Sequence, residues 1–405
     1  MLHTRYESDQ ALMNTWTKKV MLTLLLVLLA LVPLGVIPGF SFLAQDEWLR
    51  LLATVAIFVI GALGLNILTG LAGQVSLGHA FFMGIGAYTA AWLGSPPGPH
   101  FGLGLPIWIW LPAAGIVAAL VGIAVGPTAV RVRGLYLAFV TLGLVFVGEY
   151  VFRNWTSLTG GSQAGRTFPA LELKLWREED PIISFAGGGP WFGLDLASEA
   201  KTYYFMVLLA IVFVVMAKNV QRTRIGRAFQ SIRDRDIAAE IMGVDEFRYK
   251  LVAFGISSFY AGISGALFAV FVSRMIPEQW NLFLSVQFIA IVLIGGAGVV
   301  TGTILGSIFV IVLPRLVIDF TSWLADVVQG EGFLAAFADL FISTGVGDFG
   351  LVNTQAGVAP GLSIAQLNQV LYGLLIIAFL IFEPLGLYGI WLRIRNYWKG
   401  WPFTY

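Results

Sequence analysis

The chain has 405 residues, of which 58% are hydrophobic and 12% are charged, whereas soluble domains carry about 25% charged residues. This composition excludes an ordinary soluble domain and indicates a protein with many membrane spans. The net charge of +1 indicates little about partners, because the positions of charges matter more than their sum in a membrane protein. The absence of cysteine excludes disulfides, Fe–S clusters and thiolate metal sites.

Ten hydrophobic segments are long enough to cross a bilayer, which requires about 20 apolar residues in a helix. They lie near residues 20–38, 48–68, 74–94, 106–126, 134–152, 203–217, 250–272, 283–297, 302–318 and 367–385. We therefore predict an all-α, polytopic membrane protein of about ten transmembrane helices. The glycines between 295 and 302 favour a tight turn between the eighth and ninth spans over one long broken helix.

Lysine and arginine are unequally distributed between the two sides of the ten spans. Sixteen of the 24 basic residues fall on the side that holds both termini and the segment 218–250. Since cytoplasmic loops carry the excess of positive charge, this distribution predicts cytoplasmic N and C termini. Lys18 and Lys19 precede the first span without a small-x-small cleavage pattern, so we expect a retained anchor.

Three segments outside the spans differ in composition, and we expect all of them to belong to a single permease domain over 1–405. The outer loop 153–202 contains the alternating sequence Leu171 to Leu175, which predicts a short strand or hairpin. The outer segment 319–366 is acidic and has no lysine or arginine. Its part from Ser322 to Phe341 is predicted to lie on the membrane surface as an amphipathic helix or to enter the bilayer as a hairpin.

The cytoplasmic segment 218–250 carries helical signals. Its apolar residues at helical spacing predict an approximate apolar face that contains Ala228, Ile232, Ile237 and Ile241. Gly243 follows the last of these turns and is a natural helix stop. The alternative is a loop without a docking role, whose basic residues only reflect the excess of positive charge in cytoplasmic segments.

The sequence contains no catalytic motif and no metal-binding motif. No lysine follows a glycine, so the phosphate cradle of an ATPase is absent, and there is neither a His/Glu helix motif nor a nucleophile elbow. Glu149 with Arg153, and Arg315 with Asp319, have the spacing of paired charges near helix ends, which favours interfacial pairs over a proton relay. We predict a protein that is not an enzyme and that binds no cofactor itself.

Small residues at intervals of four predict close helix packing at two places. These positions are Ala72, Ser76, Ala80 and Gly84 in and before the third span, and Gly298, Gly302 and Gly306 at the start of the ninth. His79 lies near the start of the third span. A buried histidine there is interpreted first as a hydrogen-bond donor to a neighbouring helix and second as a group that contacts substrate.

Four blocks of residues resemble the permeases of branched-chain amino-acid ABC importers, specifically the LivM-type subunit. These blocks are Gly64–Ala80, Arg133–Tyr136, Leu158–Ser162 and the loop 224–254. The pattern Ser76-Leu77-Gly78-His79-Ala80 is similar to the LivM type and differs from its LivH-type sister. The resemblance covers about residues 50–315 and 382–403, while the segment 319–366 looks longer than the family pattern.

The resemblance implies that the cytoplasmic loop docks a short coupling helix into an ATPase. The residues that match or flank this element are Arg227, Arg233, Ala238, Ala239, Glu240 and Gly243. Candidates for the translocation path are the polar residues of the best-matched block, namely Asn66, Thr69, Gln74, Ser76 and His79.

The function implied is import of branched-chain or other small neutral amino acids across the bacterial inner (plasma) membrane. The implied partners are a second, LivH-type permease, two ATPase subunits that hold ATP and Mg, and a periplasmic substrate-binding protein. Membrane lipid would surround the complex, and no nucleic acid is expected. The alternatives are a permease for urea or short amides, a secondary transporter that needs no ATP, and a membrane scaffold without transport activity.

Overall fold

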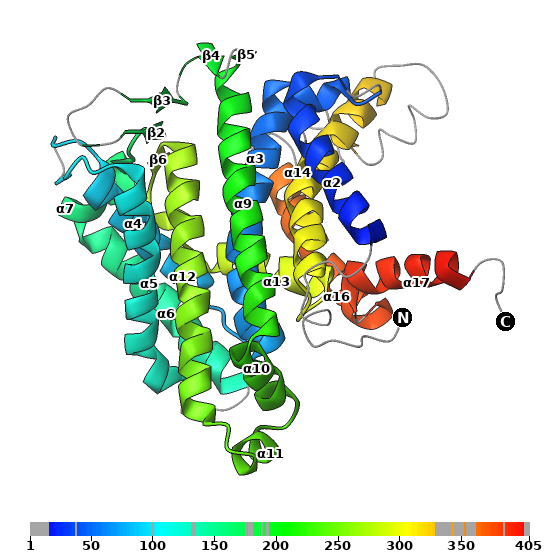
Figure 1. The fold of residues 1–405 in the computed structure, drawn as a ribbon. Coiled ribbons are helices and arrows are strands. Elements are labelled where there is room, and N and C mark those ends of the chain that lie inside the picture. Colours follow the sequence, from blue (N-terminus) through cyan, green and yellow to red (C-terminus); the bar gives the residue numbers. More distant parts are fainter. Residues whose placement is uncertain are drawn as a thin grey trace. The chain divides into compact units, whose positions relative to one another are not determined.

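The computed structural model describes residues 16–36, 39–98, 101–130, 135–174, 176, 181–185, 187, 189–191, 194–328, 342–343, 352–353, 362–383 and 385–400. The chain forms two compact units, Met1–Leu284 and Ser285–Tyr405 (Figure 1). The assignment of the whole chain to one permease domain stays a prediction. Of the family-like blocks, Arg133 and Gly134 lie outside the described residues.

Within the described residues, seven helices rather than ten are long and apolar enough to cross a membrane. They are Asp46–Leu71, Ile107–Pro127, Tyr136–Asn154, Ser198–Arg222, Glu246–Val272, Pro277–Gly295 and Val300–Leu324. The other three predicted spans coincide with shorter apolar helices, namely α2 (Trp16–Leu31), α4 (His79–Gly94) and α16 (Ile364–Phe382). The count of ten is thus not confirmed. An apolar run in the sequence can continue through a turn, so the helix within it can be shorter than the run. The cytoplasmic location of the termini stays a prediction.

The centre of the first unit is α12 (Glu246–Val272), which packs against α3 (Asp46–Leu65), α4 and α5 (Ile107–Val130). Glycines allow the closest approach. A Cβ on Gly86 of α4 would overlap the backbone of Gly262 in α12, and a Cβ on Gly265 would overlap the backbone of Met83. The helices can therefore touch backbone to backbone, as small residues permit in membranes.

The remaining helices of the first unit flank this centre. α9 (Ser198–Arg222) packs on α3, and α6 (Leu135–Asn154) packs on α4. α10 (Arg224–Asp234) and α11 (Asp236–Ile241) lie at one end of the unit. Strands β2 to β5 and helix α7 (Thr156–Thr159) lie at the opposite end (Figure 1).

Short strands occur mainly in the loop between α6 and α9. β2 (Glu172–Leu173) pairs antiparallel with β3 (Ile183–Ser184), which confirms the predicted hairpin. β4 (Gly189–Trp191) pairs with β5 (Leu194–Leu196). β1 (Arg166–Thr167) pairs with β6 (Arg274–Met275), which follows α12, so the loop is fixed to the helix core.

The second unit contains most of α13 (Leu282–Gly295), then α14 (Val300–Val328), α16 and α17 (Gly386–Gly400). The predicted turn between α13 and α14 is confirmed, with Gly296 and Gly298 at φ angles of 112° and 85°. Gly302 and Gly306 of α14 lie directly against the backbone of Gly295 and Ile291 in α13. Gly298 belongs to the turn, so it is not a packing position on the helix.

The acidic segment 319–366 begins inside a helix rather than after one. α14 runs without interruption to Val328, and Arg315 forms its predicted pair with Asp319 at 3.0 Å. The expected surface helix therefore starts as a continuation of a span, and its part from 329 to 341 lies outside the described residues. Three two-residue strands follow in parallel, at Ile342–Ser343, Val352–Asn353 and Leu362–Ser363.

Candidate functional site

The third predicted span is interrupted at its start, and this break is the first element of the candidate site. α3 continues into the π-helix η3 (Asn66–Leu71), and residues 72–78 then have no helical structure before α4 begins at His79. The prediction that Gln74–Gly78 belong to a span is wrong. Their backbone is unwound instead, which a membrane protein tolerates only where protein or an aqueous cavity surrounds it. π-helical turns are frequent at functional sites.

Neighbouring hydroxyl groups satisfy the backbone of the break. The Leu77 amide donates to Thr141 Oγ1 of α6 at 2.9 Å, and the Gly78 amide donates to Ser76 Oγ at 3.2 Å. Thr69 Oγ1 donates to the Gln74 carbonyl at 3.1 Å. The unwound segment thus has a defined conformation that is fixed by α6 and by its own polar side chains.

Gln74 differs from the other path candidates in its side chain. Only 4% of Gln74 is exposed, and neither its amide nitrogen nor its amide oxygen has a hydrogen-bond partner. Thr69 and Ser76 bond within the break, and Asn66 is buried with an interaction of its own. A buried amide that lacks partners calls for an explanation, since the great majority of buried polar groups are satisfied.

His79 is 2% exposed, and its side chain hydrogen-bonds to the backbone of Gly61 in α3. This contact is the one expected of a structural donor to a neighbouring helix. Ala72 and Ala80, predicted as packing positions, are also buried, Ala72 in the break and Ala80 in the first turn of α4. Gly84 faces side chains rather than a helix backbone, because a Cβ there would lie 2.6 Å from Phe152 and 3.1 Å from Trp280.

Arg233, the second element of the site, connects α10 to the break. Its Nη1 donates to the Gly70 carbonyl in the π-helix at 2.8 Å. A Cβ on Gly73, whose φ angle is 70°, would lie 2.8 Å from Arg233 Cγ and 3.3 Å from its Cα. Sequence analysis grouped Arg233 with residues that face an ATPase, but the structure directs its guanidinium toward the broken helix.

Residues 224–241 form two helices with different surroundings, so the four residues of the predicted apolar face do not share one face. Ala228 and Ile232 of α10 are buried, whereas Ile237 and Ile241 of α11 are 64% and 80% exposed. The extended backbone of Arg235, with φ −156° and ψ 97°, turns α11 away from the axis of α10. The face therefore divides, and half of it points away from the unit.

The other coupling candidates lie on or beside this exposed helix. Ala238 and Glu240 are exposed and Ala239 is buried. Gly243 ends the helix as predicted, with φ 86° and its amide bonded to the Glu240 carbonyl at 2.9 Å. Arg227 is exposed on α10. Together with Met242, which is 83% exposed, Ile237 and Ile241 form an apolar group on the surface, defined here as the α11 patch.

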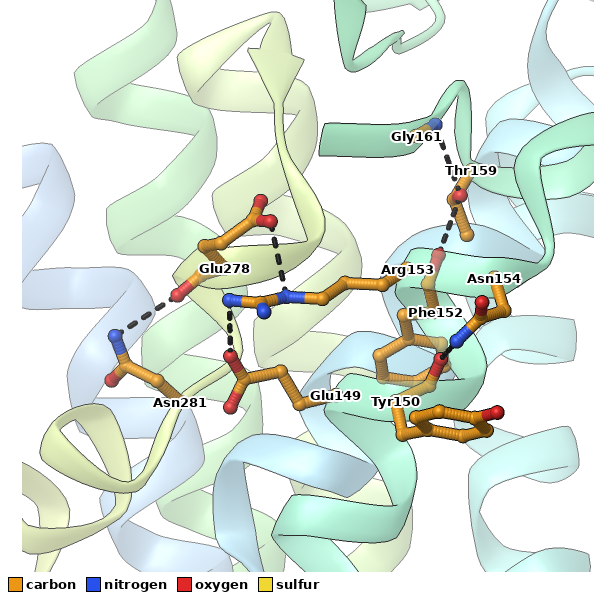
Figure 2. A network of polar contacts seen from close by, with 9 residues as sticks. All are labelled: Glu149, Tyr150, Phe152, Arg153, Asn154, Thr159, Gly161, Glu278 and Asn281. Carbon is orange, nitrogen blue, oxygen red and sulfur yellow. Dashed lines mark hydrogen bonds and ion pairs between the residues drawn. The ribbon is translucent and has the colours of Figure 1, made fainter. Parts of the chain in front are cut away.

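At the opposite end of the unit, Arg153 lies between two carboxylates (Figure 2). Its Nη2 is 2.8 Å from Glu149 Oε1, which confirms the predicted pair, and its Nε is 3.1 Å from Glu278 Oε1. Thr159 of the family-like block closes the end of α6, because its Oγ1 donates to the Phe152 carbonyl at 2.7 Å. The Gly161 amide donates in turn to Thr159 Oγ1 at 3.2 Å.

Sequence analysis missed the structural role of Arg166. This residue is 1% exposed, and its guanidinium donates to the carbonyls of Leu158, Ala91 at 3.0 Å and Phe101, so it joins three segments. Burial lowers the pKa of Arg166, but an arginine remains charged at neutral pH. The sequence offered one signal for this role, because Arg166 follows the glycine-rich block Leu158–Ser162 by only a few residues.

Comparison with known proteins gives consistent matches. Residues 48–380 match the family described as branched-chain amino acid transport system / permease component. The chain is 34% identical over 306 residues to the high-affinity branched-chain amino acid transport system permease protein LivM of Escherichia coli (strain K12), which covers 74% of this chain and 69% of that protein. The LivM protein of Salmonella typhimurium (strain LT2) is 33% identical over the same coverage.

A more distant relative is an autoinducer 2 import system permease protein LsrC of Escherichia coli O9:H4 (strain HS). It is 24% identical over 322 residues, which is 76% of this chain and 84% of that protein. No solved structure matches the chain.

Proposed function

The chain belongs to the family of permease components of branched-chain amino acid transport systems, and we propose that it is the LivM-type subunit of an ATP-driven importer in the bacterial inner membrane. It is a multi-pass membrane protein and not an enzyme. The proposed substrates are branched-chain amino acids or other small neutral amino acids. Urea and short amides are the second candidates, because the amide and hydroxyl groups of the path candidates could also hydrogen-bond to them.

The contact between Arg233 and the broken helix is the observation that carries this proposal. The guanidinium bonds to the Gly70 carbonyl, and the side chain lies against Gly73. A movement of α10 would therefore displace the unwound segment 72–78 directly. Such a rigid connection is what transmission of force from a partner to a translocation path requires.

The α11 patch supports docking of a partner at this end of the unit. Exposed apolar groups that gather on a surface mark interaction sites. Glu240 lies on the same helix as the patch and Arg227 is exposed on α10, so the two helices present charges of both signs. We propose that a groove in an ATPase subunit receives α11, as a hydrophobic groove receives a short helix.

The complete importer would contain this chain, a LivH-type permease, two ATPase subunits and a periplasmic binding protein. ATP and Mg would bind to the ATPase subunits. The end with α10 and α11 would face the cytoplasm, together with both termini, and the end with β2 to β5 would face the binding protein. Gln74 is the first choice among the path candidates, because its buried side-chain amide has no partner within the described residues.

Reconstitution tests the proposal as a whole. Proteoliposomes that contain all the subunits should accumulate leucine only with ATP and the loaded binding protein. Uptake by the purified chain alone, driven by an ion gradient, would instead identify a secondary transporter. The absence of any substrate flux in the complete complex would favour a scaffold.

The docking role of α11 is tested by Glu240→Arg combined with Gly243→Leu. We expect substrate-stimulated ATP hydrolysis and uptake to fall at least about tenfold, because the charge reverses and leucine disfavours a positive φ. The measurements are copurification of the ATPase subunits and uptake into proteoliposomes.

The matched control is Glu47→Arg with Gly39→Leu. Gly39 also has a positive φ, 80°, with open space around it, and both residues lie outside the α10–α11 segment. The control should retain near-normal coupling. Normal uptake and hydrolysis by the α11 variant would show that α11 is not the docking element.

A further inference from the structure

Four buried polar atoms in the half of the first unit opposite to α10 and α11 have no hydrogen-bond partner. They are Tyr88 Oη, Arg166 Nε, Glu278 Oε2 and Trp280 Nε1. Tyr88, Arg166 and Trp280 are at most 2% exposed, and the side chain of Glu278 is 28% exposed. These residues come from α4, β1 and the turn before α13, so the fold and not the sequence brings them together.

The four groups are neighbours. The Tyr88 hydroxyl lies beside the Trp280 indole, and it is close enough to Glu278 and Arg166 to interact electrostatically with both. The geometry between Tyr88 Oη and Trp280 Nε1 nevertheless does not meet that of a hydrogen bond. Each charged group keeps one position free, because Glu278 uses Oε1 for Arg153 and Arg166 uses its terminal nitrogens for backbone carbonyls.

The unused groups form a complementary set for one class of ligand. Arg166 Nε, Trp280 Nε1 and the Tyr88 hydroxyl are donors, and Glu278 Oε2 is an acceptor with negative charge. An α-amino acid presents a carboxylate that accepts hydrogen bonds and an ammonium that donates them. The set thus matches both ends of a zwitterion, and it would match a simple anion or a simple cation at one end only.

Aromatic rings border the four groups. The Phe152 and Phe168 ring centroids lie 5.0 Å and 6.4 Å from that of Tyr88. Gly84 packs directly against Phe152 and Trp280, because a Cβ there would lie 2.6 Å from the first ring and 3.1 Å from the second. These surfaces suit the apolar side chain of a branched-chain amino acid.

A cavity borders one of the four residues, Arg166, and its neighbour Phe168. It has a volume of about 1160 Å³. Its lining includes the C-terminal end of α4, the loop before α5, Arg166, Phe168 and Arg274. Arg166 and Phe168 thus border both the cavity and the buried groups.

We propose that Tyr88, Arg166, Glu278 and Trp280 form a binding site for the ammonium and carboxylate groups of the transported amino acid, between its release by the binding protein and its passage to the broken helix. This inference rests on the proposed function. It assigns the substrate chemistry to residues outside the best-matched block, at the far end of α4 from Gln74.

Tyr88→Phe is the sharpest test, because the hydroxyl has no hydrogen bond of good geometry within the described residues and its removal leaves the packing intact. In proteoliposomes with the complete importer and saturating leucine-loaded binding protein, uptake should fall about threefold to tenfold, the effect of one hydrogen bond to a ligand. The melting temperature of the complex should stay equal or rise. Trp280→Phe should lower uptake in the same direction.

The matched control is Tyr260→Phe in α12. Its hydroxyl is also buried but donates to the Phe213 carbonyl at 3.2 Å, so its loss should lower the melting temperature and leave uptake per folded complex unchanged. Wild-type uptake by Tyr88→Phe would overturn the site and assign the four groups to ordered water. Absence of uptake in the wild-type importer would instead refute the proposed function.

The zwitterion chemistry has its own test without the binding protein. Leucine at millimolar concentration should raise the melting temperature of the purified wild-type complex, and Tyr88→Phe should reduce that shift. 4-Methylpentanoate, which lacks the ammonium, and isoamylamine, which lacks the carboxylate, should have little effect. Equal stabilisation by either analogue would contradict recognition of both charged ends.

Discussion

Replacing Gly73 with alanine is expected to reduce amino acid uptake more than tenfold while the ATPase subunits remain bound. The residue has a φ angle of 70°, and the left-handed conformation costs an alanine roughly 1–2 kcal/mol. The new methyl group would also lie 2.8 Å from Arg233 Cγ. The variant must therefore either shift α10 or change the unwound segment, and both changes disturb the proposed connection. Uptake and copurification of the ATPase subunits are the measurements.

Gly39→Ala is the control for backbone strain, because Gly39 has φ 80° and no atom within 4 Å of an added Cβ. It should leave uptake unchanged. A double-mutant cycle with Arg233→Ala gives a second control, since two residues in contact have non-additive effects. Additive effects of Gly73→Ala and Arg233→Ala, or uptake by Gly73→Ala within twofold of wild type, would contradict the connection.

Arg166→Met is expected to destabilise the first unit by about 3–5 kcal/mol, which is in the range for loss of a buried hydrogen-bonded charge. Methionine fills similar space but donates nothing to the carbonyls of Leu158, Ala91 and Phe101, which would then lie buried without that donor. Lysine cannot replace the planar guanidinium and should also destabilise. Thermal unfolding of the purified complex is the measurement.

Arg274→Met provides the comparison for Arg166→Met. Arg274 lies in β6, opposite Thr167 of β1, and is exposed beside the same cavity. An exposed substitution of this kind changes stability by about 0.5 kcal/mol or less. Equal losses of stability in the two variants would show that the three carbonyl contacts of Arg166 contribute little.

The predictions for Gly73 and Arg166 concern opposite ends of α4. Gly73 and Arg233 act at the end that carries α10, whereas Arg166 holds the Ala91 carbonyl near the end of α4. At the first site a loss of uptake is expected with a loss of stability of roughly 1–2 kcal/mol from backbone strain. At Arg166 the expected loss of stability is larger, about 3–5 kcal/mol, and a loss of uptake accompanies it because Arg166 also belongs to the proposed binding site.

Much of this architecture follows from sequence alone. The apolar composition and the resemblance blocks indicate a membrane permease of the branched-chain amino acid family, and the family match over residues 48–380 confirms it. The helix stop at Gly243, the turn after α13, the hairpin at 172–184 and the pair of Glu149 with Arg153 were also predictable. Each depends on residues close together in sequence, whose geometry is set by local backbone preference or helical spacing.

Tertiary structure decided the break after the π-helix, the outward turn of α11 and the position of Arg166. Hydropathy does not distinguish a partly buried unwound segment from a helix, because it reports composition and not backbone conformation, and Leu77 needs Thr141 of a distant helix to satisfy its amide. Likewise, a single extended residue, Arg235, separates the buried Ile232 from the exposed Ile237. The amino-acid sequence by itself determined that the protein is a membrane permease of this family. Contacts between residues distant in sequence decide which buried polar groups have hydrogen-bond partners, so only the tertiary structure determined where the groups without partners meet.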